Sequence, residues 1–164
     1  MSHAKNKLEW CLKKAGKESG GKHRGLIKID PDLEVARDHV QKAERNLRVT
    51  FYLEQGGFTD WCSSSLFYVI YHCFLAILSK YGYESRNQEC TFAVIQVLME
   101  DGMIDLKKED VESVTMLEVG ENESAVSLRE KYQYSTQISL GKEEYSKLLT
   151  LAKTILDKTK EIVI

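Results

Sequence analysis

One long apolar run restricts the possible folds of this chain more than any other feature. Residues 59–83 read TDWCSSSLFYVIYHCFLAILSKYGY, and no charged residue stands between Asp60 and Lys80. A helix over this run would be apolar on almost every side, so other elements must wrap it. The run also approaches the length of a membrane span. Because serines and His72 interrupt it and charged amphipathic segments flank it, we favour a central helix of a chain without a membrane span.

The composition is that of an ordinary globular protein. The chain has 164 residues, of which 43% are hydrophobic and 29% charged, and its net charge is -2. These values favour one domain with a substantial core and exclude a generally basic nucleic-acid binder. The single proline, Pro31, favours long uninterrupted helices. We therefore expect an all-α fold.

Amphipathic helices are expected on both sides of the central run. One begins after Asp30 and Pro31, a helix-start signal, and ends at Gly56-Gly57, so it should pack antiparallel to the central helix. Ser85 and Gln88 fit a capping box for a further helix.

Later segments are less regular until the last helix. A short helix is expected near residues 106–117, followed by a polar loop, GENES, at 120–124. Residues 124–138 fit either helical turns or an extended strip, and this alternative stays open. After Gly141 the apolar spacing predicts a final helix that reaches nearly to the C-terminus.

Residues 1–30 form the one distinctly basic segment, with eight Lys or Arg residues. We expect a basic arm with a short helix and a flexible glycine-containing linker, separate from a bundle over residues 31–164. The arm is either simply solvated or a contact for a phosphate backbone. Its start lacks the apolar core of a secretory signal, so a cytoplasmic location is expected. The candidate phosphate contacts are Lys13, Lys14, Lys17, Lys22 and Arg24.

The four cysteines, Cys11, Cys62, Cys73 and Cys90, contain no Cys-x-x-Cys pair. We interpret them as small buried hydrophobic residues in a reducing compartment. Their spacing matches no standard zinc pattern, so no metal site is expected. The sequence also has no glycine-rich phosphate loop and no paired carboxylates at metal-ligand spacing, so it indicates no cofactor.

Several short blocks together resemble the HEPN family. They are ARDHVQKAERNLRV (36–49), SSSLFYVIYHCFLAIL (63–78), GYESRNQECTF (82–92) and LREKYQYS (128–135), followed by the last amphipathic helix. The resemblance covers residues 31–164 and implies a four- to five-helix up-down bundle, often a homodimer. Members of that family are frequently ribonucleases or toxin-like partners of small nucleotidyltransferases, mainly in archaea and bacteria.

The family's ribonuclease signature is only partly present. It consists of an Arg, often followed by a polar residue such as Asn, with a His four to six residues further on. Arg86-Asn87 fits its opening, but positions 90–92 are Cys, Thr and Phe. Similar archaeal sequences tend to have a His where this chain has Gln88. An amide cannot exchange a proton near neutral pH as imidazole can, which argues against catalysis by the family's usual route.

The remaining candidates for a site are an arginine at a helix start and a histidine in the central helix. Arg86 could hold an anion or instead pair with Glu84 or Glu89, and His72 could act as a general base or as a hydrogen-bonded core residue. The expected ligand-binding residues are Arg86, Asn87, Arg129, Tyr132 and Tyr134.

Two functions stay open. The favoured one is a non-catalytic or weakly catalytic HEPN-like binding module, a homodimer that pairs with a nucleotidyltransferase or binds RNA or a nucleotide. The alternative is a metal-independent ribonuclease in which Arg86 holds the scissile phosphate and His72 transfers the proton.

Overall fold

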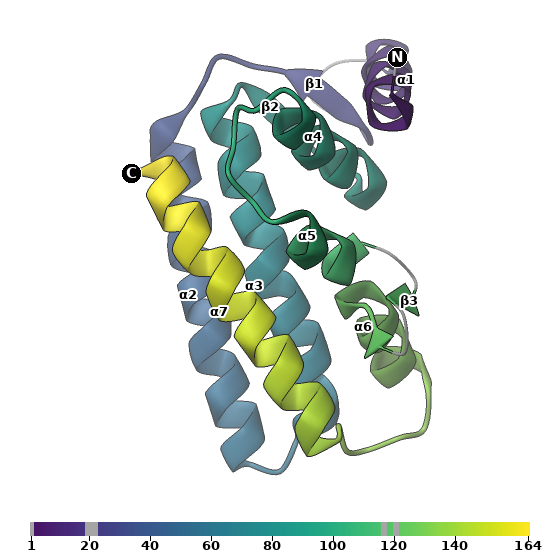
Figure 1. Cartoon of the computed structure of the whole chain (residues 1–164), viewed down its shortest axis with the longest axis vertical. Coiled ribbons are helices and arrows are strands. Elements are labelled where there is room, and N and C mark those ends of the chain that lie inside the picture. The colour runs from purple at the N-terminus through teal and green to yellow at the C-terminus, as the bar shows by residue number, and fades with distance from the viewer. Residues whose placement is uncertain (1, 19–22, 116–117, 120–121) are drawn as a thin grey trace.

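The computed structural model describes residues 2–18, 23–115, 118–119 and 122–164, and it is mostly helical (Figure 1). This confirms the all-α expectation. Seven helices are present in the described residues, and six of them lie within residues 31–164, where four or five were expected, because residues 125–134 are also helical. The helices are α1 (His3–Gly16), α2 (Leu33–Gln55), α3 (Thr59–Lys80), α4 (Gln88–Glu100), α5 (Lys108–Thr115), α6 (Ala125–Tyr134) and α7 (Lys142–Val163).

Helices α2 and α3 form the expected antiparallel hairpin, and α7 packs beside both (Figure 1). The cap of α2 differs from the prediction: the Val35 N–H donates to Asp32 Oδ1 at 3.0 Å, so Asp32, not Asp30, begins the helix. At the turn, Gly57 has a φ of 81°, a conformation that favours glycine.

Helix α3 is the core of the molecule, as its composition predicts. It contacts α2, α4, α6 and α7, and the side chains of Phe67, Ile70, Phe74 and Ile77 are almost completely buried. It is long and apolar enough to cross a membrane by length and composition, but 67% of its most apolar window is buried inside the structure. Such burial is what a core helix of a globular bundle shows.

The segment between α4 and α7 contains two short helices and a pair of short strands. Helix α5 lies where a short helix was expected, and α6 shows that the LREKYQYS block is helical rather than extended. The expected polar loop GENES lies partly outside the described residues. Its Asn122–Glu123 pair forms strand β4, which is antiparallel to β3 (Glu118–Val119).

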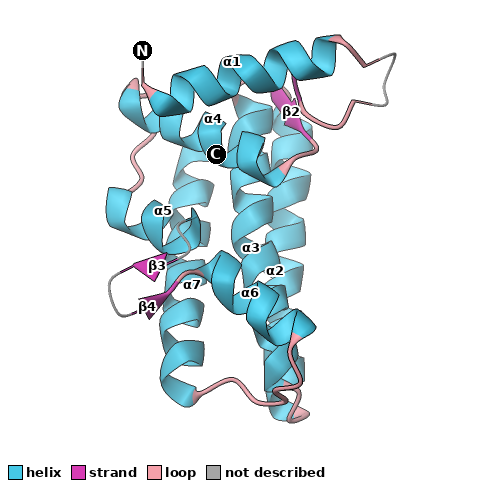
Figure 2. Cartoon of the chain, turned by 90° about the vertical axis from the view of Figure 1, so that its right-hand side faces the viewer, coloured by secondary structure: helices cyan, strands magenta, loops and turns pink. Residues whose placement is uncertain are grey.

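The N-terminal helix packs against the rest of the molecule and is not the separate arm that we expected. Figure 2 shows α1 lying across one end of the long helices, beside α4. Ala4, Leu8, Cys11 and Ala15 are buried on this side of α1. Periodic apolar residues give α1 one face that must be covered, and α4 covers it. The linker that we expected to be flexible falls partly on residues outside the described part of the chain.

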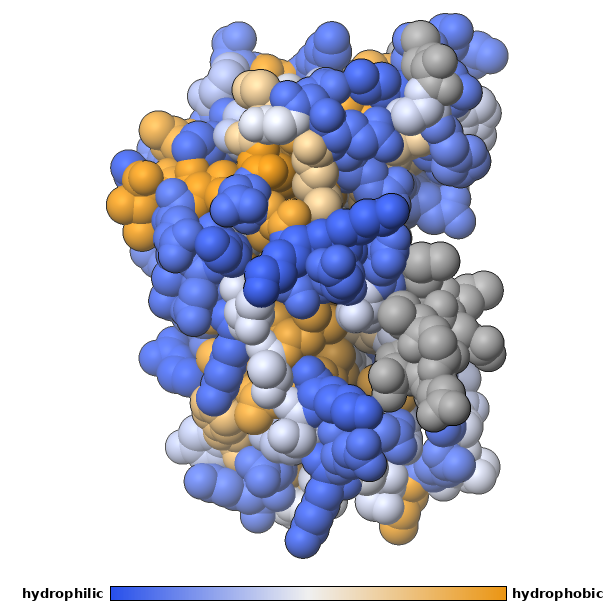
Figure 3. Space-filling view, viewed as in Figure 1, coloured by the Kyte–Doolittle hydropathy of each residue, from blue (hydrophilic) through white to orange (hydrophobic). Residues whose placement is uncertain are grey.

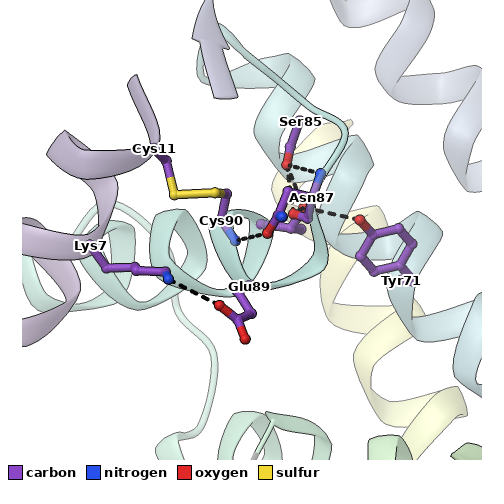
Figure 4. The surroundings of a disulfide bond; sticks show 8 residues. Lys7, Cys11, Tyr71, Ser85, Asn87, Glu89 and Cys90 are labelled. Carbon is purple, nitrogen blue, oxygen red and sulfur yellow. Dashed lines mark hydrogen bonds and ion pairs between the residues drawn. A yellow bond between two sulfur atoms is a disulfide. The ribbon is translucent and has the colours of Figure 1, made fainter. Parts of the chain in front are cut away.

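A disulfide joins Cys11 of α1 to Cys90 of α4 (Figure 4). Both cysteines are buried, as expected, but their interpretation as residues of a reducing compartment is wrong, because the packing of α1 on α4 brings the two sulfur atoms into a bond. Cys62 and Cys73 are free and buried, as expected. Disulfides persist in oxidising compartments and in the cytosol of hyperthermophiles, so the bond argues against an ordinary reducing compartment.

Candidate functional site

The segment before α4 is shaped by a small antiparallel sheet. Strand β1 (Leu26–Lys28) pairs with β2 (Tyr83–Ser85), and the Arg86 N–H donates to the Gly25 carbonyl at 2.9 Å. Gly82 precedes β2 with a φ of 82°, and a Cβ there would lie 2.8 Å from the carbonyl oxygen of Ile29. The N-terminal segment thus forms one side of the region that carries Arg86.

The N-terminus of α4 is capped by Asn87, not by the predicted box of Ser85 and Gln88. The Cys90 N–H donates to Asn87 Oδ1 at 3.0 Å (Figure 4). Ser85 Oγ instead accepts a bond from Thr91 Oγ1 at 2.8 Å. Asn87 is therefore a structural cap, and its side-chain oxygen is already engaged.

Arg86 lies just outside α4 with its side chain 47% exposed. Its guanidinium is 3.2 Å from Glu84 Oε1, the same oxygen that lies 2.8 Å from Nε2 of the buried His23. Any anion bound here would share the guanidinium with this carboxylate. Because Glu84 is itself about two-fifths exposed, water screens the pair and it contributes little to stability.

Gln88 and Arg129 are brought together from α4 and α6. Arg129 Nη2 donates to Gln88 Oε1 at 3.4 Å, and the guanidinium lies 4.6 Å from the ring centroid of Phe67. Only 15% of the Arg129 side chain is exposed. Its neighbours on α6 differ, since Tyr132 is buried and Tyr134 is 78% exposed. Arg129 and Tyr132 thus stabilise the packing of α6, whereas Tyr134 is free to contact a partner.

His72 lies on the side of α3 that faces α2. Its Nδ1 is 3.0 Å from the Nδ1 of His39 on α2. Burial, and secondarily the nearby His39 and Lys42, lower the pKa of His72 to about 4. The imidazole is therefore neutral at neutral pH. The contacts of the described residues do not bring the two candidate catalytic residues together.

A basic and aromatic surface on α1 was only partly anticipated. Trp10 is 50% exposed, with the ammonium groups of Lys7 and Lys14 at 4.5 Å and 5.1 Å from its ring centroid. These three residues, which we call the Trp10 patch, are spaced by three and four along the helix, so they share one face. That spacing could have been found in the sequence. Lys14 was predicted as a phosphate contact, but Lys7 and Trp10 were not, and Lys22 lies outside the described residues.

The Trp10 patch is fixed to the start of α4. Lys7 Nζ lies 2.9 Å from Glu89 Oε2, next to the disulfide of Cys90 (Figure 4). Two residues before Lys7 on α1, Lys5 pairs at 2.8 Å with Asp101, which lies just past the other end of α4. The N-terminal half of α1 is thus held against both ends of α4, which gives the patch a defined position.

An open groove of about 610 Å³ lies between α2 and α7. Figure 3 shows this face as largely hydrophilic, with apolar patches between the charged groups. The groove mixes Arg48 and Lys153 with Asp157 and the ion pair of Lys160 and Glu44. Charges of both signs give it no clear preference for an anion.

Comparison with models of known protein families and with curated proteins found no match. The resemblance to the HEPN family therefore stays a prediction. Among the described residues, no group of three or more His, Cys, Asp or Glu side chains could hold a metal ion.

Proposed function

We propose that this chain is a HEPN-like helical module that binds single-stranded RNA or a nucleotide without cleaving it. The observation that carries the proposal is the Trp10 patch: a half-exposed indole between two ammonium groups, on a helix held to α4 by two ion pairs and a disulfide. An aromatic face stacks on a base of any sequence, while neighbouring cations neutralise phosphates. Such binding needs no general base.

Arg86 is the second proposed contact. It follows strand β2, and α4 beyond it is joined to α1 through Cys90, so the guanidinium belongs to the same end of the molecule as the patch. Its partial exposure permits a phosphate to compete with Glu84. Tyr134 offers a further exposed aromatic ring on α6.

Fluorescence anisotropy with a labelled single-stranded RNA tests this function. Base stacking contributes about 1–3 kcal/mol, so Trp10→Ala should weaken binding roughly 5- to 150-fold. Lys14→Ala should lower the slope of log affinity against log salt by about 0.7. Tyr52→Ala and Lys108→Ala are controls at an exposed aromatic and an exposed cation on other elements, and they should change neither quantity. Unchanged affinity in Trp10→Ala, or no binding at low salt, would contradict the proposal.

The metal-independent ribonuclease is the alternative, and it has less support. The positions where the signature His is expected hold the buried Cys90, Thr91 and Phe92, and His72 is engaged by His39. An RNA cleavage assay in EDTA distinguishes the two functions. The wild type should be inactive, and cleavage that Arg86→Ala abolishes would favour the ribonuclease. Gln88→His would restore a His beside Arg129, and cleavage by this variant alone would identify a nuclease that has lost its catalytic group.

We also propose that the chain is a homodimer, through the exposed side of α3. Trp61 is 58% and Tyr68 41% exposed, and together with the partly exposed Leu75 they repeat every seven residues, which aligns them on one face. Exposed aromatic residues at such spacing are typical of helix partners. Sedimentation should give about twice the chain mass, and Tyr68→Asp should give monomers while Tyr134→Asp should not.

A nucleotidyltransferase is the other proposed partner for the α3 face. A mixed complex would replace the homodimer, because both partners would cover the same residues. We also propose a cytoplasmic location. The disulfide argues against it, because disulfides are rare in a reducing cytosol.

A further inference from the structure

His39 of α2 and His72 of α3 bring two imidazole nitrogens together across the α2–α3 hairpin. Their Nδ1 atoms are 3.0 Å apart, and the ring centroids are 5.3 Å apart with a tilt of 32°. Both side chains are partly exposed, so ions and water can reach them. We propose that this pair is a binding site for a divalent late transition-metal ion, such as Zn²⁺, Ni²⁺ or Cu²⁺.

The spacing of the two nitrogens suits such an ion. Imidazole nitrogens bind zinc at about 2.0–2.1 Å, so two of them lie about 3.3 Å apart at a tetrahedral angle and about 2.9 Å apart at a right angle. The observed 3.0 Å falls between these values. The distance between the two nitrogens therefore matches that of two imidazole ligands, and a metal ion replaces the hydrogen bond once both rings turn so that their Nδ1 lone pairs converge on it.

The protonation state also suits a metal. Burial lowers the pKa of both imidazoles, so both are neutral near pH 7, and neutral imidazole is the form that ligates metals. Asp38 lies close enough to His39 to favour a positive charge there. The positive charge of Lys42 disfavours a positive charge at His72. Because the Lys42 side chain is exposed, water screens this repulsion.

Two ligands from one chain leave the coordination shell open. No third His, Cys, Asp or Glu joins the pair among the described residues, so water, or the same pair in a second copy, completes it. Competing thiol sites are weak, because Cys11 and Cys90 are in a disulfide and Cys62 and Cys73 are buried. An open shell of this kind binds reversibly and can accept an exogenous ligand.

Calorimetric titration of the untagged chain with ZnCl₂ and with NiCl₂ tests the site. One ion should bind per chain, or one per two chains if copies share it, with a micromolar dissociation constant. His39→Gln and His72→Gln should each weaken binding at least tenfold. The sequence supplies a matched control, since His3→Gln alters an exposed histidine of α1 and should leave binding unchanged. MgCl₂ should not bind, because Mg²⁺ prefers oxygen ligands.

Circular dichroism shows whether each variant is folded, and the two single variants test the site independently. Zinc should also raise the melting temperature of the wild type but not of His72→Gln. Zinc binding that is equal in the wild type and a folded His72→Gln variant would overturn the proposal. So would a dissociation constant above 1 mM for both zinc and nickel, or a loss of binding in His3→Gln.

Discussion

The disulfide between Cys11 and Cys90 should contribute a large part of the stability of this protein. The two cysteines are 79 residues apart in sequence. In the chain-entropy model, cross-linking a loop of that length lowers the conformational entropy of the unfolded state. This loss stabilises the folded state by roughly 4.5 kcal/mol at 25 °C. Measured effects are commonly smaller, so we expect reduction to lower the free energy of unfolding by about 2–4 kcal/mol.

Urea unfolding followed by circular dichroism measures this effect. With a slope of about 2 kcal/mol per molar urea, the midpoint should fall by roughly 1–2 M when a reductant is added. The double variant Cys11→Ala with Cys90→Ala should unfold at the lower midpoint and should not respond to the reductant. Cys62→Ala is the control for the loss of a buried free thiol, and its midpoint should still respond.

A thiol count gives a second readout. The oxidised protein should expose two reactive thiols in urea without reductant, Cys62 and Cys73, and four after reduction. Four reactive thiols before reduction would show that the bond is absent. An equal response to reductant in the double variant would show that the loop-closure reasoning does not account for the stability change.

Three further predictions concern stability. In metal-free protein, the free energy of unfolding should fall by roughly 1–2 kcal/mol as the pH drops from 6.5 toward 4. Over this range His72 becomes protonated in the unfolded chain but stays neutral in the folded protein, where its pKa is about 4. Acid unfolding of His72→Gln should lack this component. Gly82→Ala should destabilise the protein more than Gly57→Ala in thermal melts, since both have positive φ but only Gly82 approaches a carbonyl, that of Ile29. Asn87→Ala should cost about 1 kcal/mol in urea unfolding through loss of the α4 cap, and an unchanged midpoint would contradict that role.

Local pattern in the sequence determined the long helices of this protein. The expected central run over residues 59–83 corresponds to α3, Thr59–Lys80, and the Gly56-Gly57 turn joins it to α2 as expected. These features depend on spacings of three and four and on residues that favour turns, which act between near neighbours in the chain. Even the Trp10 patch on α1 follows from such spacing, although we did not recognise it in the sequence.

Tertiary packing decided which distant residues meet. The sequence offered Arg86 and His72 as candidate catalytic residues of one site. In the structure His72 contacts His39, which is 33 positions away, and Gln88 contacts Arg129, which is 41 positions away. The disulfide joins residues still further apart. No local spacing encodes such pairs, because they depend on how helix faces cover one another. Periodicity can show that a face must be buried, but only the packed structure determines which element buries it and which side chains then come into contact.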